Sequence, residues 1–306
     1  MKKIAWLALL AALALGAGCL FTASAEEFRS GDFAYILLED GTAGITQYKG
    51  WDAAVVIPES LDGYPVTSIG EFAFDRLYSG LASVTIPQGV VSIGDYAFSD
   101  CGYLASVSMP DSVKTIGVRA FRNCSSLTAL ALPDGLEEIG DEAFAGCSGL
   151  TAVTIPDSVK MIGINPFQGE SLETLAVSPD HPWLAVSDGV LFTRADKRLV
   201  CCTRAQARSV YEVPQGTLSI GDKAFRNCAW LAAVTIPDSV TAIGEEAFFR
   251  CPDLATVRIP GSVTSAGDDL FDRRHDNLTV IVDRNSYMER YCRQHEITFI
   301  YAEPGD

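Results

Sequence analysis

Apolar residues recur with a fixed period along most of the chain. The clearest unit is PDSVTAIGEEAFFRCPDLATVRI, residues 237–259, and the stretches on both sides repeat it. In eight units a glycine is followed four residues later by a phenylalanine: Gly70 and Phe74, Gly94 and Phe98, Gly117 and Phe121, Gly140 and Phe144, Gly163 and Phe167, Gly221 and Phe225, Gly244 and Phe248, Gly267 and Phe271. Internal repetition at this period predicts a solenoid.

The apolar positions within one unit predict the shape of a coil. The L-x-x-L-x-L pattern of residues 127–132 predicts a short strand with its leucines turned inward. Pro133 ends this strand because it cannot donate to a neighbouring ladder. We expect Gly140 to supply a turn and Phe144 to fill the convex side. One unit cannot bury enough apolar surface alone, so we predict an α/β leucine-rich-repeat solenoid of about nine 23-residue coils.

Three segments depart from the period and divide the chain. Residues 26–57 alternate as strand, turn and strand, which predicts an N-terminal β cap for the solenoid of residues 58–281. About residues 180–213 form an insertion of three short strands, which we expect to project from the solenoid edge as a β-island. Residues 282–306 predict a C-terminal cap of one helix, opened by a capping box at Ser286, and one strand.

The first 25 residues have the features of a secretory signal peptide. Lys2 and Lys3 precede an apolar core, and Ala23-Ser24-Ala25 forms a cleavage site. An alternative is lipidation at Cys19, in the context Leu-Gly-Ala-Gly-Cys. We expect an exported bacterial protein, either secreted or held at the cell surface. No later apolar run is long enough to span a bilayer.

Charge narrows the possible partners. The net charge is −16, and without Lys2 and Lys3 there are 21 cations against 39 anions. Nucleic acid and anionic membranes are therefore poor partners for the surface as a whole. The one electropositive patch that we expect lies in the insertion. We call it the basic island and predict that it binds ligand: Arg194, Lys197, Arg198, Arg204 and Arg208.

Five of the nine cysteines occupy the same place in their coils, three residues after the repeated phenylalanine: Cys101, Cys124, Cys147, Cys228 and Cys251. This regularity favours a ladder of buried free thiols over disulfides between neighbouring coils, the alternative for an exported protein. No C-x-x-C pair or nearby histidine accompanies the ladder, so no metal is expected.

The run VVIPESLDGYPVTSIGEFAF, followed by repeats of the form IPDSVxxIGxxAFxxCxxLxxVTIP, resembles the BspA-like leucine-rich-repeat family of bacterial surface proteins. The resemblance covers nearly all of the chain after residue 25. It implies surface display and binding of a macromolecule, either protein or polysaccharide, at a cell surface or matrix. In the repeats themselves, the outward strand positions are mostly Ala, Ser and Thr, and we expect them to form a concave sheet that is a second candidate binding face.

Enzymatic chemistry has little support in the sequence. The three histidines have no H-E-x-x-H spacing, and neither a G-x-S-x-G elbow nor a P-loop occurs. We therefore predict no catalytic residue and no cofactor. The leading hypothesis is a non-enzymatic binding module of adhesin type, acting through the concave sheet or the basic island. A structural spacer or self-assembling surface protein is the main alternative, and a hydrolase is a lesser one.

Overall fold

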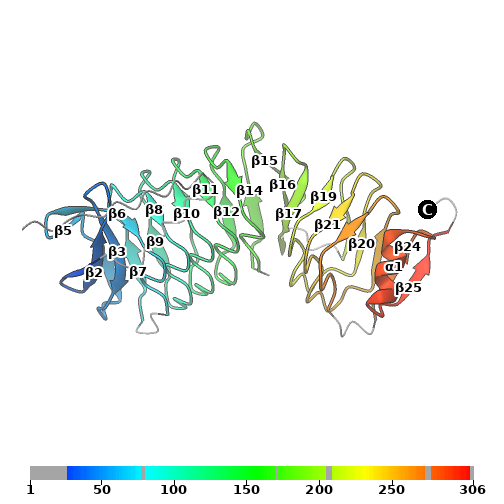
Figure 1. Ribbon diagram of the computed structural model, residues 1–306, viewed down its shortest axis with the longest axis horizontal. Helices are drawn as coiled ribbons and strands as arrows, with labels where there is room; N and C mark the ends of the chain where they lie inside the picture. The colour runs from blue at the N-terminus through cyan, green and yellow to red at the C-terminus, as the bar shows by residue number, and fades with distance from the viewer. Residues whose placement is uncertain (1–25, 77–79, 170, 205–208, 273–276, 304–306) are drawn as a thin grey trace, which may run out of the picture.

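The computed structural model describes residues 26–76, 80–169, 171–204, 209–272 and 277–303, and they form an elongated β-solenoid (Figure 1). It has about 11 turns with repeats near 23 residues, and its one helix lies near the C-terminus. The predicted leucine-rich-repeat solenoid is confirmed. The predicted signal peptide with Cys19, and Arg208 of the basic island, lie outside the described residues.

The N-terminal segment is continuous with the stack. Strands β1 (Glu27–Ser30), β2 (Phe33–Leu37) and β3 (Ala43–Tyr48) form an antiparallel meander. Strand β3 then pairs in parallel with β6 (Tyr64–Ile69), whose hairpin partner is β5 (Ser60–Leu61). The chain therefore has more turns than the nine we predicted, because segments assigned to the cap and the insertion also pair with coils.

One face of the solenoid carries a strand of three or four residues in most coils, and we call it the strand face. Its strands form three parallel sheets: β4 (Ala54–Val56), β7 (Ser83–Thr85) and β9 (Ser106–Ser108); β12 (Ala152–Thr154) and β14 (Thr174–Ala176); β18 (Val210–Glu212), β20 (Ala233–Thr235), β22 (Thr256–Ile259), β24 (Thr279–Val282) and β25 (Phe299–Tyr301). Val107 and Val153 are buried while Ser106 and Thr154 are exposed, which is the alternation that the repeat predicts.

The strand face is interrupted at residues 127–132, where the L-x-x-L-x-L pattern led us to predict a strand. The structure has no strand there, so this prediction is wrong. Leu130 stands where the flanking coils have Val107 and Val153, and Leu132 where the next coil has Ile155. Here both positions lack the branched Cβ that favours the extended backbone, whereas each neighbouring coil has a β-branched residue at one or both of them. A hollow of about 420 Å³ also separates this coil from the next.

A second set of short strands, absent from our prediction, follows each proline turn. They are β8 (Ser92–Ile93), β10 (Thr115–Ile116), β11 (Glu138–Ile139) and β13 (Met161–Ile162), and after the insertion β19 (Ser219–Ile220), β21 (Ala242–Ile243) and β23 (Ser265–Ala266). They pair in parallel from coil to coil. Their isoleucines are buried, so each coil is held to the next on two sides.

The repeated glycines, one of which we expected to supply a turn, permit close approach between coils. None of the eight, all within the described ranges, has a positive φ. A Cβ on Gly140 would lie 2.6 Å from the Gly117 carbonyl carbon. The residue two positions later is left-handed instead, as with Tyr96 (φ 55°) and Arg119 (φ 53°). Glycine is required at these positions because the preceding coil occupies the space of a side chain.

The segment from each repeated glycine to the following cysteine forms the turn face, which is also hydrogen-bonded between coils. Tyr96, Phe98 and Asp100 donate their backbone N–H groups to Val118, Ala120 and Arg122 of the next coil, at 2.8, 2.7 and 2.7 Å. The same three bonds recur in later coils. Because of these left-handed residues, alternate backbone N–H groups point along the solenoid axis. The turn face is therefore hydrogen-bonded from coil to coil without forming strands.

The repeated phenylalanines form two stacks inside the turn face. Tyr48 extends the first, and centroids of successive rings from Tyr48 to Phe167 lie 4.7–5.5 Å apart. The second contains Phe225, Phe248 and Phe271, at 5.1 and 5.6 Å. The insertion separates the two stacks.

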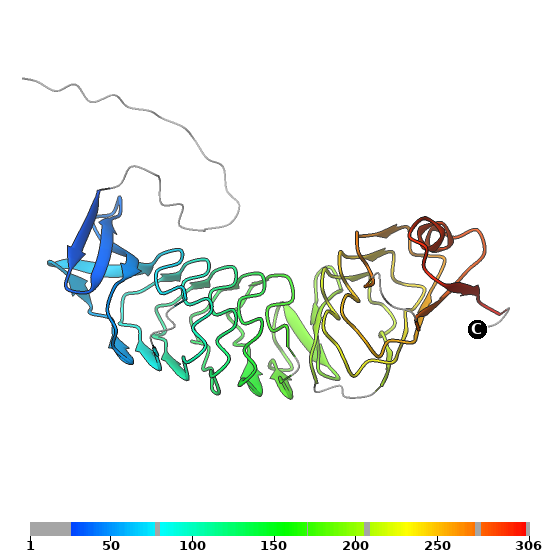
Figure 2. The same cartoon turned by 90° about the horizontal axis from the view of Figure 1, so that it is seen from below.

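The insertion forms a wall inside the solenoid, so our expectation that it projects from the edge is wrong. Strands β15 (Leu184–Ser187), β16 (Val190–Thr193) and β17 (Arg198–Cys202) make an antiparallel meander, and β17 pairs in parallel with β19. Cys201 packs in the core on its N-terminal side, and Cys202 packs in the core on its C-terminal side. The meander lies between the two halves of the stack (Figures 1 and 2). Apolar residues on both of its faces favour this burial.

The C-terminal cap follows its prediction. Helix α1 (Tyr287–Gln294) begins after Ser286, whose Oγ accepts the Glu289 N–H at 3.0 Å. Strand β25 closes the last sheet beside β24. Cys292 lies on the buried side of the helix, and this burial raises its pKa to about 12.

The predicted ladder of buried thiols is confirmed. The Sγ atoms of Cys101, Cys124 and Cys147 donate to the carbonyl oxygens of Phe74, Phe98 and Phe121 in the preceding coils, at 3.0–3.2 Å. Hydrogen bonding with the Cys147 thiol, together with burial, raises the pKa of Cys124. These cysteines therefore act as small apolar residues with one weak donor.

Candidate functional site

The structure gathers part of the basic island around the turn between β16 and β17. The Arg194 guanidinium donates to the carbonyl oxygens of Leu184 and Pro179 at 2.8 and 2.9 Å. Arg198 donates to the Ile162 carbonyl at 3.4 Å and lies 3.7 Å from Asp196. Lys197 is exposed in the turn. Two of these cations therefore also hold the insertion in place.

The basic island contains two further cations, Arg204 and Arg208. Arg204 is exposed, just after β17. Arg208 lies outside the described residues. The structure thus places four of the five within the insertion.

The strand face offers a smooth, weakly charged surface. Most of its outward positions are small and exposed, as at Ser106, Ser108 and Ala152, and the larger exposed residues Val56, Val210 and Ile300 lie in its outer strands. Arg258 is paired with Asp283 at 3.2 Å, so its charge is compensated. Strong interfaces usually rely on aromatic or arginine anchors, and this face supplies area without them.

Four arginines that we did not single out converge where the turn faces on the two sides of the insertion meet. Arg119 and Arg122 come from a coil before the wall, and Arg226 and Arg250 come from coils after it. We call them the junction arginines. They line a hollow of about 490 Å³, which we call the junction hollow. The basic island is therefore not the one electropositive patch of the molecule.

Glu142 holds the two halves together beneath this hollow. Its buried carboxylate accepts Arg119 Nε at 2.6 Å and Lys223 Nζ at 2.5 Å, from opposite sides of the insertion. Burial alone would raise the pKa of Glu142, but the hydrogen bonds from Arg119 and Lys223 outweigh it and lower the pKa. Lys223 also approaches Glu246 at 3.9 Å, which extends the ion-pair network.

The sequence contained a signal for this cluster. The pentapeptide Ala-Phe-Arg-Asn-Cys occurs at residues 120–124 and again at residues 224–228. Each copy places an arginine directly after the repeated phenylalanine. We read these copies as two members of a repeat, and only the fold shows that their coils meet.

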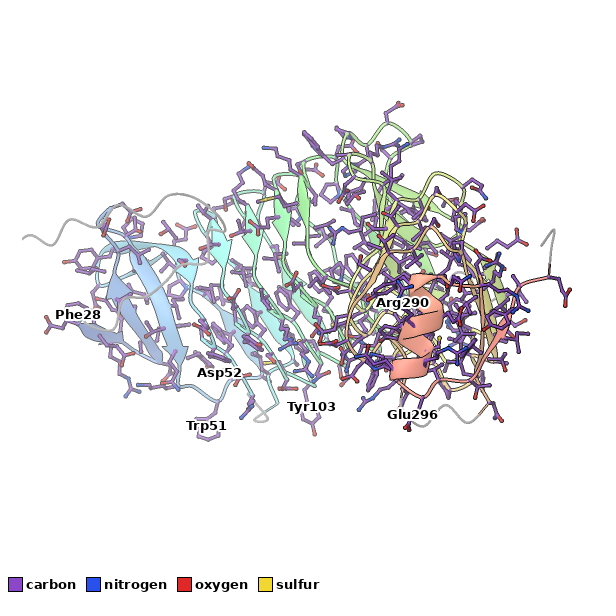
Figure 3. All side chains as sticks on the ribbon, turned by 45° about the vertical axis from the view of Figure 1, so that its right-hand side comes forward. Phe28, Trp51, Asp52, Tyr103, Arg290 and Glu296 are labelled. Carbon is purple, nitrogen blue, oxygen red and sulfur yellow. The ribbon has the colours of Figure 1, made fainter. Side chains whose placement is uncertain are left out.

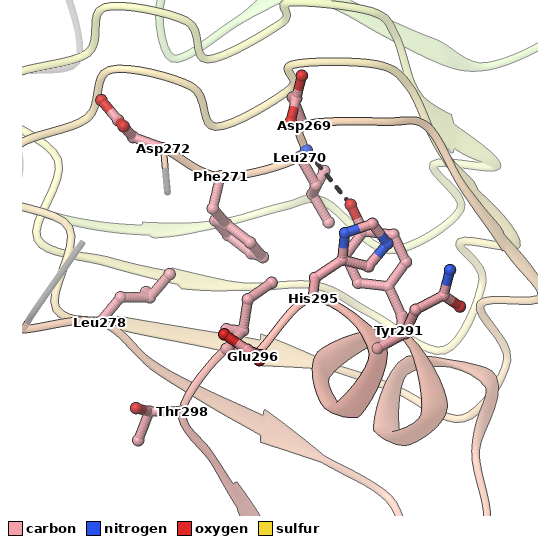
Figure 4. Close-up of a pocket in the computed structure, with 11 residues that line it drawn as sticks. Asp269, Leu270, Phe271, Asp272, Leu278, Tyr291, His295, Glu296 and Thr298 are labelled. Atoms are coloured by element: carbon pink, nitrogen blue, oxygen red, sulfur yellow. Dashed lines mark hydrogen bonds between the residues drawn. The ribbon is translucent and has the colours of Figure 1, made fainter. Parts of the chain in front are cut away.

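A second hollow, of about 550 Å³, lies between the last coil and helix α1 (Figure 4). The Tyr291 hydroxyl accepts the Leu270 N–H at 3.3 Å and donates to the Gly267 carbonyl at 3.1 Å. The Tyr291 ring stacks on His295, with centroids 4.2 Å apart. These contacts hold the helix against the last coil, so Tyr291 and His295 serve the cap.

Exposed aromatic residues mark one edge of the N-terminal half. Trp51 and Tyr103 are 82% and 63% exposed, and both extend outward along this edge (Figure 3). Isolated exposed aromatics are ordinary, and the structure does not bring these two into contact with the junction arginines.

The described residues contain neither a candidate metal cluster nor a candidate membrane-spanning helix. Within the described ranges, no three His, Cys, Asp or Glu side chains gather in a way that could hold a metal ion. Across the part of the chain that the structure describes, no helix has both the length and the apolar character needed to cross a bilayer.

Comparison with known proteins identifies the repeat. The family described as BspA type Leucine rich repeat region matches residues 64–181 and 205–297, in six copies. No curated protein matches the chain.

Solved structures show the same fold. A leucine-rich cell surface protein of Faecalibacterium prausnitzii is 23% identical, with a TM-score of 0.54, covering 92% of this chain and 96% of its own. A leucine-rich repeat protein of Eubacterium ventriosum is 24% identical, with a TM-score of 0.68, covering 84% and 78%. The pneumococcal vaccine antigen PcpA is 17% identical, with a TM-score of 0.60, covering 91% and 99%.

Proposed function

Because the chain belongs to the BspA-type leucine-rich-repeat family, we propose that it is an exported, non-enzymatic surface protein of adhesin type that binds a macromolecule. The family match over most of the repeats carries this proposal. It is supported by the cell-surface description of the protein from Faecalibacterium prausnitzii, which shares the fold. The signal-like residues 1–25 support export, with Cys19 as an alternative attachment point.

The build of the solenoid is consistent with a binding role. Its core is mainly apolar and its described thiols are buried. The groups available to bind a ligand therefore lie on the surface. The strand face extends along both halves and presents small side chains, and the basic island lies at the wall between them. A ligand that spans several coils would gain from this repetition of shallow contacts, as extended surfaces of solenoids allow.

The test is binding of residues 26–306 to immobilised matrix proteins, acidic polysaccharides and whole cells. A variant with Arg194, Lys197, Arg198, Arg204 and Arg208 changed to alanine is measured in parallel. Salt-sensitive binding that the variant loses would assign the basic island. Equal binding by both proteins would assign a different surface. Absence of binding to every target, with concentration-dependent self-association, would favour the spacer over the adhesin.

A further inference from the structure

The junction hollow concentrates positive charge on an acidic protein. Its lining includes the four junction arginines and one carboxylate, Glu142. That carboxylate is already engaged by Arg119 and Lys223, so the lining keeps an excess of positive charge. Like charges held together are costly unless an anion compensates them. The chain as a whole has a net charge of −16, which makes this local reversal of sign notable for recognition.

Three of the four guanidinium groups, those of Arg119, Arg226 and Arg250, are held by their neighbours. Arg119 lies over the Tyr96 ring at 5.7 Å and donates Nη1 to the Tyr96 hydroxyl at 2.8 Å. Arg226 and Arg250 lie over the ring of Phe249, at 5.3 and 5.7 Å from its centroid. Arg226 also pairs with Glu246. Preorganised arginines lose less conformational entropy when they bind.

Two of the four arginines retain all of their donors for a ligand. Among the described residues, the guanidiniums of Arg122 and Arg250 have no hydrogen-bonding or ion-pairing partner. They come from opposite sides of the insertion, so the ligand would contact both halves. A planar guanidinium donates two parallel hydrogen bonds to a carboxylate or sulfate, which makes arginine well suited to these groups.

The remainder of the lining selects the class of ligand. Asn123, Ser148, Gln168 and Asn227 contribute amide and hydroxyl groups, and Ala145 is the one apolar side chain among the lining residues. A peptide ligand usually binds through apolar anchors, whereas a sugar presents hydroxyl groups that can hydrogen-bond to these amide and hydroxyl groups. The volume of about 490 Å³ falls in the range of small-molecule sites.

We propose that the junction hollow binds an acidic sugar residue, bearing a carboxylate or a sulfate, within a polysaccharide. The proposal deepens the proposed function, since it rests on a surface or matrix polymer being the macromolecular ligand. Arg122 and Arg250 receive the anionic group, and the asparagine and glutamine amides bind the hydroxyl groups. The acidic surroundings restrict recognition to a short anionic segment.

The test is calorimetric titration of residues 26–306 with a sulfated oligosaccharide, a uronic-acid oligosaccharide and a neutral oligosaccharide of equal length. The variant is R122Q/R250Q. R29Q/R290Q is the matched control, because it removes two exposed cations far from the hollow. We expect one or both acidic sugars to bind wild type and control alike, and the variant at least about tenfold more weakly, from the loss of charge-assisted bonds. The two acidic arms identify carboxylate or sulfate as the preferred group.

Other results would overturn the proposal. Equal affinity of wild type and variant, or equal binding of the neutral sugar, would remove the arginines from recognition. Binding of a hexaglutamate peptide in place of both acidic sugars would assign the hollow to protein ligands. R250Q alone, at an exposed position, serves if the double variant does not fold. If the surface panel shows binding that R122Q/R250Q retains, the proposed function stands while this site fails. If only the oligosaccharide binds, the site stands without the adhesin role.

Discussion

The strand face and the turn face are built from the same repeat, yet they differ in continuity and in charge. The strand face is broken at residues 127–132 and again by the insertion, and most of its outward side chains are small. The turn face has backbone bonds between coils, stacked rings, and ion pairs that cross the insertion through Glu142. The turn face therefore supports the stack, and it also carries the densest cluster of charged groups.

The largest expected effect comes from removing one ring of the stack. Phe121→Ala should lower the free energy of unfolding by about 3–5 kcal/mol, because a fully buried ring leaves a cavity between two neighbours. Val153→Ala, on the strand face, should cost about 1–2 kcal/mol, for fewer buried methyl groups. Urea denaturation followed by circular dichroism measures both. Equal losses of unfolding free energy in the two variants would contradict a larger contribution of the turn face to stability.

Breaking the link at Glu142 tests whether the turn face couples the two halves. Glu142→Gln should cost about 1–3 kcal/mol, below the range for fully buried pairs, because Arg119 and Lys223 are partly exposed. A separate unfolding transition for one half is the expected sign of lost coupling. Glu137→Gln is the control, since its pairs with Lys114 and Lys160 are exposed and should contribute little.

The same link predicts a response to acid. The folded pKa of Glu142 is lowered from its ordinary value of 4.5, so its contribution is present above that pH and is lost as the pH falls through the folded value. Wild type should therefore lose stability more steeply than Glu142→Gln below about pH 4.5. Thermal melts between pH 3 and 6 provide the measurement. Parallel curves for the two proteins would show that the carboxylate does not stabilise the junction.

The thiol ladder should produce a smaller effect. Cys124→Ala should cost about 1 kcal/mol, because it removes a buried sulfur and its bond to the Phe98 carbonyl. In the folded wild type, the raised pKa and burial of Cys124 predict slow reaction with a thiol reagent at pH 8, and rapid reaction after urea is added. Immediate labelling of the ladder cysteines without denaturant would contradict their burial.

The smallest expected effect concerns the break in the strand face. Leu132→Ile supplies a β-branched residue of equal volume, so it should change stability by less than about 1 kcal/mol, in the stabilising direction. Chemical denaturation of the variant, with Leu136→Ile at a fully buried site as the comparison, provides the measurement. A large loss in Leu132→Ile would mean that the break is required by packing rather than tolerated.

The sequence by itself determined the repeat, the stack and the ends. Spacings of 23 residues, the glycine–phenylalanine pairs and the capping box at Ser286 are local or periodic signals. A solenoid contacts only neighbouring coils, so periodic signals suffice to specify most of its fold. The place of the thiols followed for the same reason, because identical positions in successive coils must lie above one another.

Tertiary structure decided what lies across the insertion and what the glycines do. The sequence marks residues 180–213 as irregular, but only the packing of Cys201 and Cys202 into separate cores makes them a wall. We predicted a turn residue at Gly140 because the sequence of one coil does not show how close the Gly117 backbone of the preceding coil lies. Arg122 and Arg250 come together only when both halves are in place. Contacts between units that break the period depend on three-dimensional packing, which a repeat pattern does not encode.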